Sequence, residues 1–223
     1  MTRSDHVITH KTAILLGFSG MIGALVLFSG DMLFYYNGAQ TDFIANMSVS
    51  SDLRVIASAV TALLAAWLYT LGAGQIYYAF APAAKWIRLT VFLSFAAVMI
   101  TYGVVHGAYV AIATSAKNAA TLGMTPDSLT DLSVTANNAL RLIAYLPFAI
   151  FSLVFIPTVW LKNTHYPRWV IMFSPVVLFF LHDPIVGSLE GRLKIIIGGG
   201  YLNLILLVFF AISTIALWNN NHQ

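Results

Sequence analysis

Six stretches of the chain are apolar for long enough to cross a membrane, and short polar segments separate them. A spanning helix needs about 20 predominantly apolar residues, because each residue adds about 1.5 Å along the axis. The sequence predicts a single integral membrane domain over residues 1–223 that is all-α, a polytopic membrane helical bundle of about six transmembrane helices. The expected spans are about 12–36, 53–80, 87–115, 138–162, 168–189 and 194–218. Pro175 and Pro184 interrupt the fifth of them.

The composition supports this class. Hydrophobic residues make up 59% of the chain and charged residues only 9%, whereas about a quarter of a soluble domain is charged. The net charge is +3, but Lys and Arg occur singly at the ends of apolar segments and form no basic stripe. We therefore expect membrane lipids, and no nucleic acid, as partners. Cysteine is absent, which excludes disulfides and thiolate metal sites.

The distribution of Lys and Arg predicts the orientation. The N-terminus and the turns near 81–87 and 163–167 carry a small excess of these cations and have tryptophans beside them, as is typical of a cytoplasmic interface. We expect both termini in the cytoplasm, in a bacterial inner membrane. The cations on this side are Arg3, Lys11, Lys85, Arg88, Lys162 and Arg168, and those on the other side are Arg54, Lys117, Arg141, Arg192 and Lys194.

Ionisable residues fall at one depth in several spans. Asp31, His106 and His182 lie roughly 8–10 Å outward of the middle of spans one, three and five. Arg141 near the outer start of span four and Asn203 in the outer half of span six fall at a similar level. Ionisable groups at membrane depth are costly and indicate a functional site by default. The sequence predicts an intramembrane polar site in the outer leaflet.

Helical spacing pairs these groups with phenols. Tyr102, His106 and Tyr109 follow one another at i, i+4 and i+7 and so share one helix face. Tyr35 lies one turn after Asp31, and Tyr145 lies one turn after Arg141. The expected ligand-binding residues are Tyr35, Tyr102, Tyr109, Arg141, Tyr145 and Asn203.

The segment His182-Asp183-Pro184 ends the fifth apolar stretch. A proline removes a backbone donor and frees carbonyl groups in the preceding turn, so His182 and Asp183 can be redirected toward a cavity or can simply cap the span. We expect His182 to be the most important group of the site. The expected catalytic residues are Asp31, His106, His182 and Asp183.

Several chemistries fit two imidazoles and a carboxylate. Asp31, His106 and His182 could hold a divalent metal such as zinc, whose bound water would hydrolyse a lipid or isoprenoid-like amphiphile. That arrangement is similar in idea to membrane-embedded ceramidase-type hydrolases, although their His-x-x-x-His pair is missing. The alternatives are a proton-coupled transporter of small molecules and an electron-transfer protein with His106 and His182 as axial ligands of a haem. The sequence leaves open whether the protein is an enzyme, and it leaves the oligomeric state open.

Two short segments carry a resemblance. Ser29-Gly30-Asp31 at the end of span one and Gly198-Gly199-Gly200-Tyr201-Leu202-Asn203 in span six resemble an uncharacterised family of bacterial multi-span membrane proteins. The resemblance covers the whole chain and implies no function. We interpret the glycines as packing surfaces for neighbouring helices.

Overall fold

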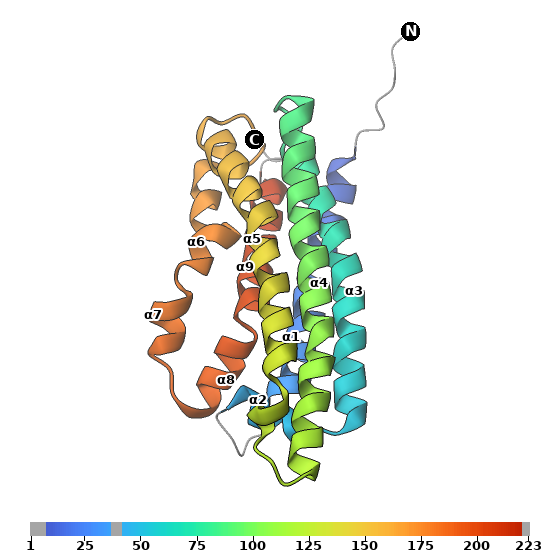
Figure 1. Ribbon diagram of the computed structural model, residues 1–223. Coiled ribbons are helices and arrows are strands. Elements are labelled where there is room, and N and C mark those ends of the chain that lie inside the picture. The colour runs from blue at the N-terminus through green and yellow to red at the C-terminus, as the bar shows by residue number, and fades with distance from the viewer. Residues whose placement is uncertain (1–7, 37–41, 220–223) are drawn as a thin grey trace.

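The protein is an all-α bundle. The computed structural model describes residues 8–36 and 42–219, and every regular element among them is helical. Within these ranges, five helices are long and apolar enough to cross a membrane, and they run alongside one another (Figure 1). The predicted fold class is confirmed. The long helices are α1 (His10–Tyr35), α3 (Asp52–Ala79), α4 (Lys85–Thr121), α5 (Asp131–Trp160) and α9 (Tyr201–Asn219).

The first and last helices meet at one end of the bundle. His10 Nε2, at the start of α1, lies 3.1 Å from the carbonyl oxygen of Leu217, near the end of α9. We call this the terminal end. The opposite end, which we call the loop end, carries the short helices α2 (Phe43–Ser48) and η1 (Pro126–Leu129) (Figure 1). Both α4 and α5 extend further toward the loop end than the expected spans, so the connection between them is shorter than predicted.

The fifth predicted span, 168–189, is not a continuous helix. It consists of η2 (Arg168–Phe173), α6 (Pro175–Phe179) and α7 (His182–Gly187), which descend toward the loop end beside the bundle (Figure 1). A helix running through Pro184 would need a hydrogen bond from residue 184 to the carbonyl of Phe180, which proline cannot donate, and its ring would clash with that carbonyl. The chain therefore breaks at Phe180 and restarts so that Pro184 lies in the first turn of α7.

The sixth predicted span is also divided. Helix α8 (Gly191–Gly199) ends at Gly200, and α9 starts at Tyr201. A side chain at Gly200 would collide with the ring of Phe28 on α1, so this position has room only for glycine. The packing interpretation of the glycines holds here, and the break places Asn203 in the first turn of α9.

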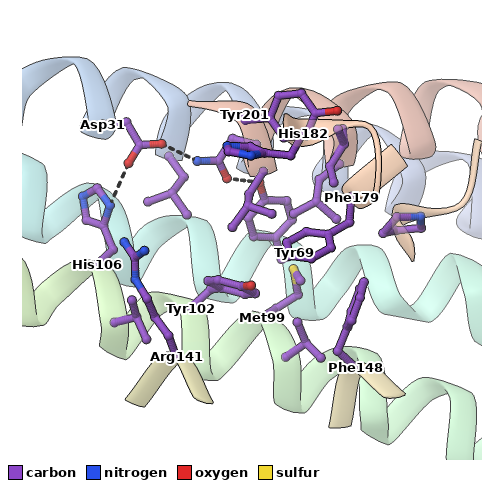
Figure 2. A pocket seen from close by; sticks show the side chains of 18 of the residues that line it. Asp31, Tyr69, Met99, Tyr102, His106, Arg141, Phe148, Phe179, His182 and Tyr201 are labelled. Carbon is purple, nitrogen blue, oxygen red and sulfur yellow. Dashed lines mark hydrogen bonds and ion pairs between the residues drawn. The ribbon is translucent and has the colours of Figure 1, made fainter. Parts of the chain in front are cut away.

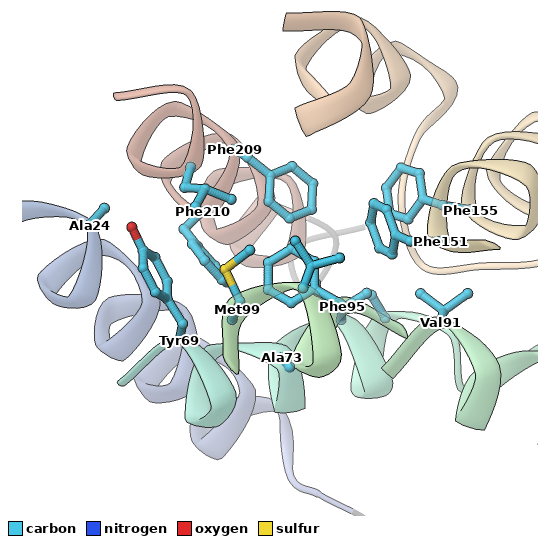
Figure 3. Close-up of a cluster of buried hydrophobic side chains, with 14 of the residues drawn as sticks. Ala24, Tyr69, Ala73, Val91, Phe95, Met99, Phe151, Phe155, Phe209 and Phe210 are labelled. Carbon is cyan, nitrogen blue, oxygen red and sulfur yellow. The ribbon is translucent and has the colours of Figure 1, made fainter. Parts of the chain in front are cut away.

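Aromatic side chains fill the middle of the bundle and its terminal half (Figure 3). Phe95 of α4 lies within 6.2 Å, centroid to centroid, of Phe151 on α5 and of Phe209 and Phe210 on α9. The outer faces of the long helices expose large apolar side chains at helical spacing. On α1 these are Leu15, Phe18, Ile22 and Leu25. Exposed leucines and phenylalanines in such stripes are typical of lipid-facing surfaces.

A buried polar network crosses this core near the terminal end. Gln75 Nε2 donates to Thr214 Oγ1 at 2.9 Å, and Ser213 Oγ donates to Gln75 Oε1 at 2.8 Å. The hydroxyls of Tyr166 and Ser213 lie 2.6 Å apart. We call these four residues the Gln75 network, which ties α3 to α9 and to the segment before η2.

Candidate intramembrane site

A chain of hydrogen bonds links four helices in the half of the bundle nearer the loop end. Tyr69 donates to Asn203 Oδ1 at 2.7 Å, and Asn203 Nδ2 donates to Asp31 Oδ2 at 2.7 Å. Asp31 Oδ1 lies 3.1 Å from His106 Nδ1, and His106 Nε2 lies 2.8 Å from Ser58 Oγ. We call these five residues the Asp31 network (Figure 2 shows its Asp31 and His106 contacts). Ser58 and Tyr69 lie about three turns apart on one face of α3, so the chain leaves α3, passes through α9, α1 and α4, and returns to α3.

The donors at both ends fix the direction of nearly every bond. Ser58 has a single hydroxyl hydrogen, which it donates to the carbonyl of Gly30 at 2.6 Å. His106 Nε2 must therefore carry a hydrogen and donate it to Ser58. At the other end, Tyr69 donates to the amide oxygen of Asn203, so the amide nitrogen faces Asp31 Oδ2. One proton remains to be placed, between Asp31 Oδ1 and His106 Nδ1.

The same contacts rule out Ser58 as an activated nucleophile in this arrangement. Ser58, His106 and Asp31 lie in the order of a Ser-His-Asp triad. In such a triad the imidazole accepts the hydroxyl proton, whereas here the proton of Ser58 is directed at the carbonyl of Gly30. Ser58 is also completely buried and does not line the cavity described next. Its role is to hold one face of His106.

A cavity of about 610 Å³ lies against the Asp31 network, between α1, α4, α5, α9 and the segment from α6 to α8 (Figure 2). This volume falls within the range of about 300–1,000 Å³ that is usual for small-molecule sites. All ten residues that the sequence singled out line it: Asp31, Tyr35, Tyr102, His106, Tyr109, Arg141, Tyr145, His182, Asp183 and Asn203. The structure thus brings the candidates to one cavity, while their roles remain predictions.

The cavity changes character along the bundle axis. Its polar end, toward the loop end, contains Asp31 of α1, His106 of α4 and Arg141 of α5. One to three turns toward the terminal end on the same helices, the lining consists of Leu27, Met99, Phe148 and other apolar side chains. The polar-to-apolar order is the same on α1 and α4, which run toward the loop end, and on α5, which runs toward the terminal end. The cavity is therefore amphipathic along one axis.

Comparison with known proteins gives the family. Residues 8–220 match the family described as a family of unknown function, DUF6796. The chain belongs to this family. No curated protein and no solved structure matches it. The resemblance to an uncharacterised family, drawn from two short segments of the sequence, is confirmed across nearly the whole DUF6796 chain.

His182 and Asp183 sit differently from the expectation that made His182 the centre of the site. His182 Nδ1 lies 2.7 Å from Asp183 Oδ1, and the imidazole packs edge-on against Tyr201 with centroids 4.9 Å apart. The side chain of His182 is 40% exposed and that of Asp183 is 96% exposed. In this DUF6796 protein the buried acid and base are Asp31 and His106, and His182 belongs to the cavity wall.

The proposed metal shell of Asp31, His106 and His182 is not assembled. Nowhere in the described ranges do three His, Asp or Glu side chains gather closely enough to hold an ion. Both ring nitrogens of His106 have protein partners, so it would have to give one up to bind zinc or a haem iron. His182 Nδ1 is in contact with Asp183 Oδ1. Among the described residues, Asp31, His106 and His182 are therefore not brought together as a three-ligand set.

Sequence reasoning missed Ser58, Tyr69 and the apolar end of the cavity. Tyr69 places a phenol in the middle of an apolar helix, which was a usable signal for a buried hydrogen bond. Ser58 carried no signal, because serines are common in apolar helices and usually bond to their own backbone. The apolar lining could not be distinguished from ordinary core without knowing where space remains.

Proposed function

We propose that the cavity is the site of a membrane-embedded enzyme that carries out acid–base chemistry on a lipid-like amphiphile. One observation carries the proposal. The same cavity has the buried pair Asp31 and His106, which share one proton, at one end and an aromatic, apolar lining at the other. The apolar end suits an acyl or isoprenyl chain, and the polar end suits the group that reacts. General acid–base catalysis by such a pair contributes about 10²- to 10⁴-fold to a rate.

The residues of the Asp31 network take different parts in this proposal. Asp31 and His106 both line the cavity and exchange the proton between them with the bound amphiphile or a water molecule. In a hydrolysis the pair would accept a proton from water as it attacks the carbonyl or phosphoryl group, and would return a proton to the leaving group. Asn203 and Tyr69 are positioning residues, because they fix the rotation of the Asp31 carboxyl.

The proposal includes an orientation. We place the terminal end in the cytoplasm and the polar end of the cavity in the outer half of a bacterial inner membrane. The small excess of Lys and Arg near the terminal end supports this placement. Because the chain lacks cysteine, single cysteines at Thr125 and Asn163 give a clean test: an impermeant reagent added to intact cells should label position 125 and leave position 163 unlabelled.

Proton-coupled transport is the second candidate, and the interruptions of the fifth and sixth predicted spans favour it. Discontinuous helices often flank the substrate site of transporters. The break at Phe180 and the division at Gly200 both border the cavity, whose lining includes Phe180, Gly199 and Tyr201. In this version Asp31 and His106 load and release a proton as the ligand crosses.

One experiment separates the two functions. Purified protein is reconstituted into vesicles made from the lipid extract of the expressing cells, with a pH-sensitive dye trapped inside. The enzyme proposal expects new lipid products by mass spectrometry with the natural protein and none with His106→Gln. If the lipids stay unchanged while the trapped dye reports proton movement that His106→Gln abolishes, the protein is a transporter and the enzyme proposal is wrong.

A further inference from the structure

Arg141 supplies the cation at the polar end of the cavity, where it is exposed and within electrostatic reach of Asp31. Within the described part of the chain, the guanidinium forms no ion pair and donates no hydrogen bond. Its one close polar contact is with the ring of Tyr109, 5.4 Å from the centroid. Figure 2 shows the Arg141 side chain reaching from α5 toward the side of the cavity where Asp31 and His106 lie. A cation held in this way presents its remaining donors to whatever occupies the cavity.

Phenols around the same end are also without acceptors. The hydroxyls of Tyr35, Tyr102, Tyr109 and Tyr145 have no hydrogen-bond partner among the residues that the structure describes, and all four residues line the cavity. Tyr35 is only 6% exposed, Tyr102 and Tyr109 are half-buried, and Tyr145 is 46% exposed. Several hydroxyls without a protein partner around one end of a cavity are available to donate to a ligand there.

The charge balance at this end is positive. Asp31 and His106 share a single proton, so together they are neutral wherever it lies. Asn203 and Tyr69 are uncharged, and both oxygens of Asp31 are already engaged by protein partners. Asp183, on the opposite wall, is in contact with His182 and is 96% exposed, so its charge is screened by solvent. The charge of Arg141 is then the unbalanced one.

We infer that the amphiphile carries an anionic head group, a phosphate or a carboxylate, bound by the Arg141 guanidinium and the hydroxyls of Tyr35, Tyr102 and Tyr109. The inference rests on the proposed function, whose ligand it specifies. An oxyanion accepts several hydrogen bonds at once, and the planar fork of arginine matches two of its oxygens. A head group held there lies beside Asp31 and His106, so the bond that reacts is close to the head and far from the end of the tail.

The test compares ligands that share a tail and differ in the head. Dodecyl phosphate, dodecanoate, dodecanol and dodecyltrimethylammonium are titrated into the purified protein in dodecyl maltoside, and apparent affinities are taken from the thermal stabilisation that binding produces. Both anions should bind at least about tenfold more tightly than the alcohol and the cation, since hydrogen bonds to charged groups are the strong ones. The ratio between the apparent affinities for dodecyl phosphate and dodecanoate identifies the head group.

Three variants locate the effect. Arg141→Gln should lower the ratio of the affinity for the anions to that for dodecanol at least about tenfold. Arg192→Gln, which removes an exposed cation outside the cavity at the same end of the bundle, should retain it. Leu202→Trp adds bulk to the cavity lining and should weaken every dodecyl ligand.

Each contradictory outcome has its own meaning. If dodecanol binds as tightly as the anions, or if Arg141→Gln keeps the preference, the anionic head group is wrong while an amphiphile site stands. If Leu202→Trp leaves anion binding unchanged, the anions adsorb at the surface and the cavity assignment is wrong. If no dodecyl ligand stabilises the natural protein, the proposed function itself fails.

Discussion

The Asp31 network and the Gln75 network are built in the same way and differ in what surrounds them. Each joins hydrogen-bonding side chains of α3 and α9 inside an apolar bundle. The Gln75 network consists of an amide and hydroxyls, and burial raises the pKa of Tyr166 well above its usual range, so the network stays neutral. It touches no part of the cavity. The Asp31 network contains an acid and a base, and it borders open space.

Under the proposed function, this difference separates a structural use of buried polarity from a functional one. In a bilayer, polar side chains between helices contribute to association because lipid offers no alternative partner. Such a contribution explains the Gln75 network fully. It does not explain an acid and a base in contact, a cavity beside them, or hydroxyls without a protein partner around the same end of that cavity. These additions at one end of the same bundle are the basis of the proposed site.

The largest expected effect is that of Asp31→Asn. The amide that replaces the carboxyl can donate from its nitrogen to His106 Nδ1 and accept from Asn203, so the network keeps its shape and loses its movable proton. We expect turnover of the lipid substrate to fall about 10²- to 10⁴-fold, with little change in thermal stability. The vesicle assay with mass spectrometry measures the first and a melting curve the second. A variant that is folded and fully active would show that Asp31 is structural.

Two alanine substitutions in α1 compare the networks directly. A methyl group at Gly17 would collide with the side chains of Gln75 and Thr214, and one at Gly30 would collide with Thr61 and lie 3.4 Å from His106 Nε2. Both variants should lose about 1–3 kcal/mol of unfolding free energy through overpacking. Only Gly30→Ala should also reduce turnover relative to the amount of folded protein. Equal turnover losses in the two variants would remove the distinction between the networks.

Gln75→Met tests the structural network alone. The substitution keeps the length of the side chain and removes its bonds to Ser213 and Thr214. The free energy of unfolding should fall by about 0.5–2 kcal/mol, the range for polar contacts between membrane helices. Reversible unfolding in mixed micelles gives the value. Turnover per folded molecule should match that of the natural protein, and a large loss would mean that the terminal end takes part in function.

His182→Ala addresses the residue that the sequence ranked first. Since its partner Asp183 is almost fully exposed, the pair is screened and contributes little. We expect less than about a tenfold loss of turnover. The measurement is the vesicle assay, run beside Asp31→Asn. If His182→Ala abolished turnover and Asp31→Asn spared it, the site would be centred on the cavity wall.

The smallest effect is expected for Gly107→Ala, next to His106 in the sequence. A methyl group there meets no atom within 4 Å. The unfolding free energy should rise by up to about 1 kcal/mol, the difference in helix propensity between alanine and glycine. Turnover should be unchanged, which makes this variant the control for substitutions near His106. A loss of activity would show that this face of α4 contacts another molecule.

Much of the fold and of the polar end could be predicted from the sequence, because depth along a helix follows directly from residue number. Counting residues along each helix places Asp31, His106 and Asn203 at one depth. In the structure, His106 and Asn203 both contact Asp31. Rotation about the helix axis and the route of a broken segment do not follow from counting. Pro184 predicted an interruption, yet nothing in the sequence told whether His182 would turn inward as the centre or stay at the wall.

The break at Phe180 leaves one wall of the cavity with a low local stability. In a helix as short as α7, His182–Gly187, most backbone groups belong to the unpaired first four N–H or last four C=O groups. Amide hydrogen exchange in this segment should therefore be governed by local opening of small free energy, while exchange in α1 and α4 should require opening of the bundle. If the proposed amphiphile enters from the lipid, it needs to displace only one short helix, and the five long helices can stay packed while the cavity fills and empties.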